Sequence, residues 1–173
     1  MMDETGPATG PQFADRPAMP AGYGIQPPTR EHGLLPWEFA SSRLESAHNY
    51  WLVTASPDGA PHAAPLWGLW HSGAFYFSTD PGSRKGRNMT SSGLALVHLE
   101  SGDDVVVFEG IVEEMTDRPT LVRLARAYAQ KYPGYEPSAE PDPNSPFYVL
   151  RPRKAYAWRE KDFPTSATRW RLG

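Results

Sequence analysis

The chain has 173 residues, a net charge of −3 and no cysteine. A chain of this length suits one domain around a single core. The lack of cysteine excludes disulfide bonds, zinc–thiolate sites and thiol catalysis, and the negative charge disfavours nucleic acid and anionic membranes as partners. No apolar run approaches the roughly 20 residues of a membrane span, and the acidic start MMDETGPATG contains no apolar signal core. We therefore expect a cytoplasmic protein.

The first 35 residues are rich in proline, glycine and polar residues and show no apolar periodicity. Such a segment buries too little apolar surface to offset the entropy that is lost on ordering. We predict that residues 1–35 form a flexible tail and that the folded domain spans residues 36–173. The alternative is a tail that lies over a partner subunit.

The folded part begins with a helix signal and continues with strand signals. A short helix is predicted from Pro36 to about Ala47, because proline suits the first helical position and the apolar residues fall near one face. Residues 50–56 are rich in β-forming side chains and precede the turn signal Pro57-Asp58-Gly59. The next run, residues 60–70, resumes as a strand whose two prolines indicate an edge, a bulge or a kink.

The rest of the chain adds more strands than helices. Helical spacing of apolar residues predicts a helix over 118–131, which precedes a proline-rich loop over 133–146. Four further strands are predicted between turns, over residues 74–79, 94–100, 105–113 and 148–158. The sequence thus predicts a mainly β fold with flanking helices, in which six antiparallel strands close into a small barrel. A parallel nucleotide-binding fold would need a helix between successive strands, and the first half of the chain shows none.

A cationic, glycine-spaced turn directly follows the predicted strand 74–79. If Arg87-Asn88-Met89 opens a helical turn, free backbone N–H groups would add to the basic side chains and hydroxyls. Arginine offers a forked donor and lysine a point charge, so the combination suits a phosphate monoester. The candidate donors are Ser78, Thr79, Ser83, Arg84, Lys85, Arg87 and Asn88. A solvated polar turn is the alternative, and the segment contains neither a P-loop nor a GxGxxG motif.

The stretch APLWGLW, residues 64–70, is a second candidate for ligand binding. Trp67 and Trp70 flank Gly68 in a strand with a proline, so backbone groups would be exposed beside flat apolar walls. An aromatic heterocycle can stack there and form hydrogen bonds to the backbone. The alternative is that both tryptophans fill the barrel or a dimer interface, as large aromatic side chains usually do.

Sequence motifs of familiar catalytic sites are missing. The sequence contains no HExxH motif, no helical pair of metal ligands and no GxSxG motif. We therefore predict surface or capping roles for the histidines at strand ends and turns, His48, His62, His71 and His98. No catalytic residue and no metal site is predicted.

Three blocks of the sequence together resemble a known family. They are WLVTASPDGAPHAAPLWGLW, AFYFSTDPGSRKGRNM and LVHLESGDDVVVFEGIVEEMTD, in this order along the chain. Over residues 36–172 the chain resembles the pyridoxamine 5′-phosphate oxidase-like split-barrel family, and within it the flavin/deazaflavin oxidoreductases of actinobacterial type. The resemblance implies a split β-barrel, a homodimer, and a flavin-type cofactor bound in grooves between the subunits.

The resemblance also implies roles for particular residues. The ring of the cofactor would lie along Pro65, Leu66, Trp67 and Gly68. Its phosphate-bearing side chain would be held by Ser78, Thr79, Arg84, Lys85 and Asn88. From the C-terminal TRWR motif, Trp170 and Arg171 would reach the ring of the other subunit.

Two features depart from the family's pattern. A pyridoxamine-phosphate oxidase carries a longer C-terminal region with residues for the substrate phosphate, and this chain shows no obvious equivalent. Oxidation of vitamin B6 is therefore not expected. The proline-rich start is also longer than a minimal barrel requires.

The sequence and the resemblance together predict an oxidoreductase that transfers a hydride between FMN or F420 and a small organic substrate, with the redox chemistry supplied by the cofactor. Both cofactors carry a phosphate on the ribityl chain, so the cationic turn does not distinguish them. The acidic tail of F420 would favour extra basic residues, and Arg151, Arg153 and Lys154 are candidates. The alternative is a non-catalytic carrier of flavin, F420 or a haem-type tetrapyrrole, which the lack of evident acid–base residues favours. A nucleic-acid-binding barrel is disfavoured by the net charge.

Overall fold

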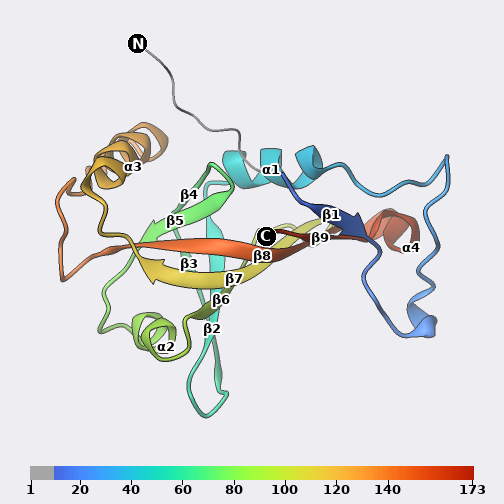
Figure 1. The fold of residues 1–173 in the computed structure, drawn as a ribbon, viewed down its shortest axis with the longest axis horizontal. Helices are drawn as coiled ribbons and strands as arrows, with labels where there is room; N and C mark the ends of the chain where they lie inside the picture. The colour runs from blue at the N-terminus through green and yellow to red at the C-terminus, as the bar shows by residue number, and fades with distance from the viewer. Residues whose placement is uncertain (1–9) are drawn as a thin grey trace.

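A nine-stranded antiparallel sheet dominates residues 10–173, the part of the chain that this computed structural model describes (Figure 1). The strands are β1 (Phe13–Asp15), β2 (Tyr50–Ala55), β3 (Pro61–Leu66), β4 (Leu69–His71), β5 (Ala74–Ser78), β6 (Leu94–His98), β7 (Asp104–Glu114), β8 (Phe147–Arg159) and β9 (Thr168–Arg171). The helices are α1 (Trp37–Ser46), α2 (Arg84–Ser92), α3 (Arg118–Lys131) and α4 (Phe163–Ser166), with short 3-10 turns η1 (Ala21–Tyr23) and η2 (Glu160–Asp162). Within residues 10–173, no helix combines the length and the apolar character that a membrane crossing requires.

The two longest strands, β7 and β8, pair with each other along their whole length. On its other edge, β8 pairs with β5 over residues 147–150 and with β9 over residues 154–157, so the sheet divides beside β8. The β7–β8 register shifts at Gly110, where a Cβ atom would lie only 2.0 Å from the Arg151 carbonyl oxygen. Glycine is therefore required at this bulge, which bends the longest strand pair.

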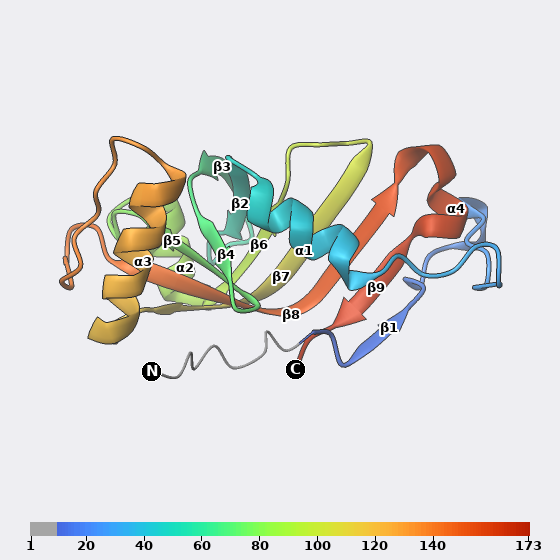
Figure 2. The ribbon, with the colours of Figure 1, turned by 90° about the horizontal axis from the view of Figure 1, so that it is seen from above.

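The alternation of side chains along β5 separates two apolar layers. Phe75 and Phe77 point into the barrel and join the core that α1 covers with Leu44. Tyr76, between them, points the other way and packs with Tyr128 in the layer beneath α3. Figure 2 shows α1 lying across the sheet and α3 at the end where β4 and β5 lie.

The predicted mainly β fold with flanking helices is confirmed, although the strand count differs. The predicted strand 60–70 is divided into β3 and β4, because the chain bends at Trp67 and Gly68. β1 and β9 add a strand pair that the sequence did not predict. The helix expected over 118–131 is present as α3 with the same bounds.

Residues 10–35 differ from the predicted tail, because they pack against the C-terminal part of the same chain. β1 pairs with β9, and Asp15 forms a forked ion pair with Arg169. Arg16 donates hydrogen bonds to four carbonyl groups, those of Gln26, His32, Gly33 and Ala167. Backbone pairing and polar contacts therefore offset the ordering entropy of a segment with few apolar residues. Residues 1–9 of the predicted tail lie outside the described residues, and the flexibility of the tail and the domain boundary stay predictions.

We expect Arg16→Ala to loosen residues 10–35 while the barrel stays folded, because four carbonyl groups lose their donor. Each such hydrogen bond contributes on the order of 1 kcal/mol. Limited trypsin digestion should then cut after the exposed Arg30 several times faster than in the unchanged protein. Arg126→Ala, on the exposed face of α3, is the control. Equal cleavage rates in the two variants would contradict this role of Arg16.

Candidate functional site

The edge strand β3 lies between a cationic helix end and an exposed tryptophan. Among residues 10–173, β3 pairs with β2 alone, so one of its backbone edges has no strand partner. After Leu66 the chain leaves β3 at Trp67 and Gly68 and enters β4, which pairs with β5. At the other end of β3, the Arg84 guanidinium lies 3.4 Å from the Pro61 carbonyl oxygen. The start of α2 therefore lies beside the Pro61 end of β3, and the exposed Trp67 follows its Leu66 end.

The first turn of α2 concentrates positive charge and free N–H groups near Pro61. Ser83 caps this helix, because its hydroxyl accepts a hydrogen bond from the Gly86 amide at 3.1 Å. The amides of Arg84 and Lys85 belong to the first turn, where no intrahelical acceptor exists. The Arg84 side chain is exposed and that of Lys85 is half-buried. This end of α2 can therefore bind an anion with two backbone donors and two cationic side chains.

Close packing fixes the direction in which α2 leaves the turn. A Cβ atom on Gly86 would lie 2.6 Å from the carbonyl oxygens of Asp80 and Pro81, so only glycine lets the helix approach the turn this closely. Arg87 donates a hydrogen bond to the Gly82 carbonyl and so points back along the turn. The predicted helical turn is a full helix, α2. It begins at Arg84, three residues earlier than expected, and Ser83 is its N-cap.

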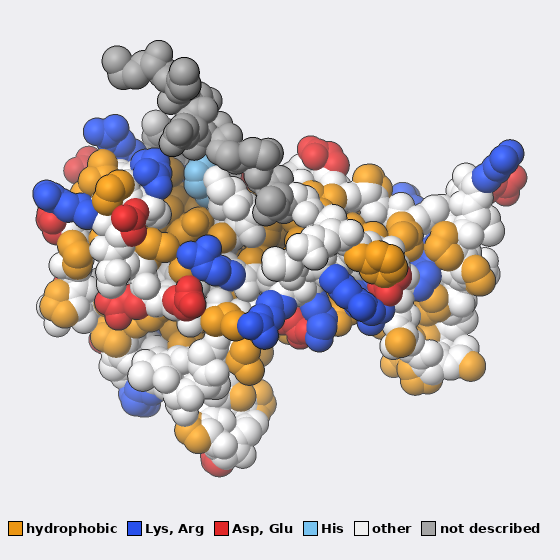
Figure 3. All heavy atoms as spheres, viewed as in Figure 1, with side chains coloured by type: hydrophobic (Ala, Val, Ile, Leu, Met, Phe, Trp, Pro, Cys, Tyr) orange, Lys and Arg blue, Asp and Glu red, His pale blue; other side chains and the backbone are white. Residues whose placement is uncertain are grey.

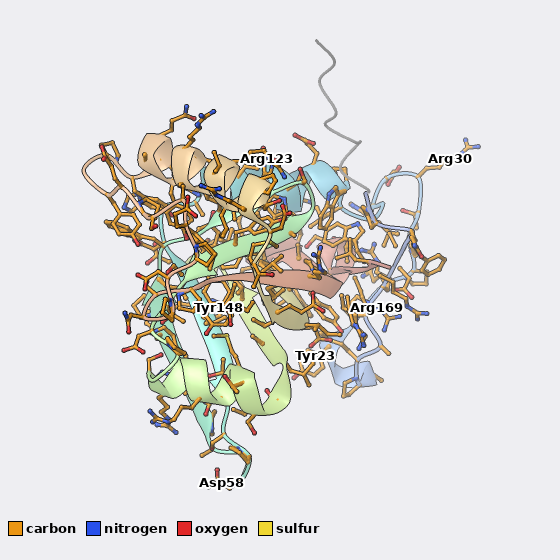
Figure 4. The ribbon with its side chains drawn as sticks, turned by 60° about the vertical axis from the view of Figure 1, so that its left-hand side comes forward. Tyr23, Arg30, Asp58, Arg123, Tyr148 and Arg169 are labelled. Carbon is orange, nitrogen blue, oxygen red and sulfur yellow. The ribbon has the colours of Figure 1, made fainter. Side chains whose placement is uncertain are left out.

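Two carboxylates lie near this helix end. Asp80 belongs to the turn before α2, and its carboxylate accepts a hydrogen bond from the Gly82 amide at 2.7 Å. Asp58 is at the tip of the β2–β3 hairpin, near α2 (Figure 4). Its pKa is lowered, chiefly by a hydrogen bond from the Ser56 hydroxyl and to a smaller extent by the charge of Arg84. Asp58 therefore stays ionised at neutral pH. An anion at α2 binds only if the attraction of the basic groups and free amides exceeds the repulsion of the nearby carboxylates.

Trp67 occupies the opposite end of β3 and is 43% exposed. Its indole stacks on the Tyr132 ring, with centroids 4.6 Å apart and an angle of 7° between the planes. The rings of His48 and Tyr135 stand edge-on to the indole, each at 5.8 Å. One face of the indole is thus fixed against the protein, and the exposed part is available to a flat ligand.

Side chains from α3 and the residue after it hold the bend at Trp67 and Gly68. The Tyr128 hydroxyl donates to the Trp67 carbonyl at 3.0 Å. The Tyr132 hydroxyl accepts from the Gly68 amide at 3.0 Å and lies 2.9 Å from the Gly68 carbonyl oxygen. The Lys131 amine donates to the same carbonyl at 3.1 Å. Burial raises the pKa of both tyrosines, so both hydroxyls stay protonated.

Sequence analysis did not identify Tyr128, Lys131 or Tyr132 as site residues. The periodicity of α3 marks Tyr128 as part of an apolar helix face, but it does not show which segment that face contacts. Lys131 and Gly68 are 63 residues apart in the chain, and only tertiary packing brings them together.

Other predicted phosphate ligands are buried or hydrogen-bonded to other parts of the chain. Asn88 is 4% exposed, and its amide donates to the Thr54 hydroxyl at 3.0 Å. The predicted role of Asn88 is therefore not supported, because its side chain is used between α2 and β2. Thr79 is 8% exposed. The Ser78 hydroxyl donates to the Ser145 carbonyl at 2.9 Å, at the edge of a pocket of about 320 Å³.

The C-terminal candidates lie on β9, at the far end of the sheet from α2 (Figures 1 and 2). Trp170 is 1% exposed and packs edge-on against Trp37 at 5.2 Å. The predicted contact of Trp170 with a cofactor ring is not supported, because the side chain belongs to the core of its own chain. Arg171 is exposed, and its guanidinium lies 5.7 Å from the centre of the Phe13 ring. A contact of Arg171 with the cofactor of a second subunit stays a prediction.

The basic residues of β8 are largely paired with acidic neighbours. Arg151 lies 3.3 Å from Glu113, and Lys154 lies 3.2 Å from Glu109. Figure 3 shows basic and acidic side chains intermixed across the middle of this face. Arg153 is exposed and, with Lys154, lines a hollow of about 620 Å³ over β2, β6 and β7. The ion pairs reduce the positive charge that β8 could offer to an acidic cofactor tail.

The donor set fits a cofactor that joins a flat ring to a phosphate. The start of α2 supplies anion-binding groups, the bend after β3 supplies an aromatic surface, and the free edge of β3 connects the two. Residues 10–173 contain no group of three or more histidine, aspartate or glutamate side chains placed to hold a metal ion.

The fold and this site define a small antiparallel barrel with an anion-binding helix start beside an open strand edge. Residues 37–159 match the family model described as Pyridoxamine 5′-phosphate oxidase. This match covers more than half of the chain, so the chain belongs to that family. A comparison with curated proteins found no match.

Solved structures with the same fold bind different cofactors according to their names. An F420 reductase is 24% identical with a TM-score of 0.55, covering 70% of this chain and 98% of that one. An FMN-binding protein related to pyridoxamine 5′-phosphate oxidase, from Nostoc punctiforme, is 16% identical with a TM-score of 0.54, covering 79% and 92%. The heme storage protein HutZ from Vibrio cholerae is 12% identical with a TM-score of 0.54, covering 66% and 85%. At these identities the likeness shows the fold alone.

Lys131 gives the stability of the protein a specific pH dependence. Burial lowers its pKa to about 8 from the ordinary value of 10.5. Between these values the unfolded state binds more protons than the folded state, so the free energy of unfolding rises with pH. From pH 7 to pH 9.5, we expect the free energy of unfolding of the unchanged protein to rise by about 1 kcal/mol relative to that of Lys131→Met. This value is reduced because the amine is half-exposed and partly screened by water.

Urea unfolding at a series of pH values measures this difference. Lys161→Met replaces an exposed lysine and should leave the pH dependence unchanged. A Lys131→Met variant with the same pH dependence as the unchanged protein would refute the lowered pKa.

Proposed function

We propose that this protein is an oxidoreductase that binds FMN or F420 along β3 and transfers a hydride between the cofactor and a small organic substrate. The observation that carries the proposal is the placement of an anion-binding helix start and an exposed aromatic surface at the two ends of one free strand edge. At about 3.4 Å per residue, Pro61 and Leu66 lie about 17 Å apart. This span suits a tricyclic ring joined through a ribityl chain to a phosphate.

Each part of the site has a separate task in this proposal. Arg84, Lys85 and their amides bind the phosphate, which anchors the cofactor. Pro65 to Gly68 lies along the ring, and the exposed Trp67 covers part of it from water. When bound, the cofactor supplies the hydride chemistry, and the protein orients the ring and the substrate.

We further propose that a second copy of the chain completes the site as a homodimer. The outer face of β2 and β6 presents half-exposed apolar side chains around the hollow of about 620 Å³, among them Val53 and Leu96. Leu94, at the same hollow, is 57% exposed. An apolar sheet face of this kind usually packs against another element. A second copy there would cover a site that is open in the single chain.

A carrier without catalysis is the second candidate. The likeness to the heme storage protein HutZ favours it. Tight binding of FMN, F420 or haem without reduction of any acceptor would favour the carrier over the oxidoreductase. The absorption spectrum and mass of the ligand that is released from the purified protein identify which cofactor it binds.

We expect Arg84→Ala with Lys85→Ala to lower the affinity for FMN and F420 by about 30-fold or more while the fold persists. Two charge-assisted hydrogen bonds are lost, each contributing about 1.5–3 kcal/mol before screening at an exposed site reduces the sum. Titration calorimetry measures the affinity. Arg123→Ala with Arg126→Ala removes two exposed charges from α3 and should leave the affinity unchanged. Unchanged affinity in the α2 variant would refute the phosphate site.

We expect Leu94→Glu to convert a dimer to a monomer in analytical ultracentrifugation, because the substitution places a charge in an apolar contact. Ser91→Glu, at an exposed position of α2, adds the same charge outside this surface and should leave the dimer intact. An unchanged protein that sediments as a monomer would rule out the proposed homodimer.

A further inference from the structure

Lys131 is a half-buried lysine whose amine meets three hydrogen-bond acceptors. Its Nζ atom lies 2.7 Å from the Tyr50 hydroxyl oxygen, 3.1 Å from the Gly68 carbonyl oxygen and 3.4 Å from the Glu45 carbonyl oxygen. Tyr50 donates its own proton to the Leu44 carbonyl, so its oxygen accepts from Lys131. An ammonium group has three donors, and each of them has one acceptor here.

Neutralisation of a carboxylate does not explain this lysine. The seven ion pairs within residues 10–173 do not include Lys131. Its charge lies instead over two aromatic rings, 4.8 Å from the centre of Tyr50 and 5.6 Å from that of Tyr132. The contact with the Gly68 carbonyl is the one that links Lys131 to the candidate site.

The bend at Gly68 is fixed from two sides. On the core side, the Phe75 ring lies 2.2 Å from the place where a Cβ atom of Gly68 would be, so the backbone packs directly on this ring. On the α3 side, the hydroxyls of Tyr132 and Tyr128 bind the Gly68 amide and the Trp67 carbonyl. These contacts hold the backbone of Trp67 and Gly68, and they therefore help to fix the position of the Trp67 indole.

We propose that Lys131 is a positioning residue that fixes the Trp67–Gly68 bend and thereby the surface on which a flavin-type ring binds. This inference rests on the proposed function. A surface that is fixed before binding lowers the entropy cost of binding. Lys131 acts on the ring end of the ligand, whereas Arg84 and Lys85 act on its phosphate.

Ligands with and without the phosphate-bearing end separate these two contributions. The first pair is FMN and riboflavin. The second pair is F420 and the fragment of F420 that consists of the ring and the ribityl chain without the phosphate. The protein is expected to bind one of these two pairs. Lys131→Met should lower the affinity for both ligands of that pair by about tenfold, which corresponds to one lost hydrogen bond. Arg84→Ala with Lys85→Ala should lower only the affinity for the phosphate-bearing member. Lys161→Met is the matched control and should change neither.

Two further variants separate positioning from packing. Lys131→Arg keeps the charge and the donors, so it should restore most of the affinity for the phosphate-free ligand. Tyr132→Phe removes the hydroxyl at the Gly68 amide and should lower the same affinity. If Lys131→Met does not fold, the affinities of Lys131→Arg and Tyr132→Phe for the phosphate-free ligand are compared instead. The inference is overturned if Lys131→Met, or Tyr132→Phe in its place, binds the phosphate-free ligand as tightly as the unchanged protein does.

Hydrogen exchange of the Gly68 amide tests the bend without any ligand. We expect exchange to be about tenfold faster in Lys131→Met than in Lys161→Met. Unchanged exchange overturns the inference even if cofactors bind. A protein that binds neither ligand pair overturns the proposed function and, with it, the role of Lys131 in cofactor binding.

Discussion

Strand β8 has two different neighbours along the edge that faces away from β7: β5 beside its first residues and β9 beside its last. One continuous strand therefore belongs to two parts of the sheet. The bulge at Gly110 bends this strand pair where Arg151 comes closest. Because β5 is held by β8, its partner β4 lies away from β3, and β3 keeps a free edge. The open site is a consequence of this division.

The candidate site is assembled from segments with separate reasons for their positions. The start of α2 is placed by a serine cap and by a glycine that lets the helix pack on its own turn. The bend after β3 is placed by α3 and the residue after it, whose hydroxyls and amine bind backbone groups of Trp67 and Gly68. Both ends of the site are therefore held through the backbone, which leaves the Trp67 and Arg84 side chains exposed for a ligand.

Basic residues in this chain have three different environments. Arg169 and Lys154 form ion pairs with carboxylates on neighbouring strands. Arg16 and Lys131 are partly buried and bind backbone carbonyls, so they stabilise irregular segments of the chain. Arg84, at a helix start, is exposed and free to meet an anion. Composition alone does not separate these groups, since each depends on which backbone or carboxylate oxygen lies within reach.

The sequence by itself determined the mainly β fold, the bounds of α3 and the placement of a cationic helix start after β5, because periodicity, capping and turn residues act between neighbours in the chain. It also marked APLWGLW as a candidate for ring binding, but it left open whether Trp67 and Trp70 are buried; Trp67 is exposed and Trp70 is buried. Only the tertiary structure decided that Asn88 and Trp170 are buried, that β1 pairs with β9, and that α3 holds Gly68. These outcomes depend on contacts between segments tens of residues apart, and local residue preferences carry no information about which distant surface a side chain will meet.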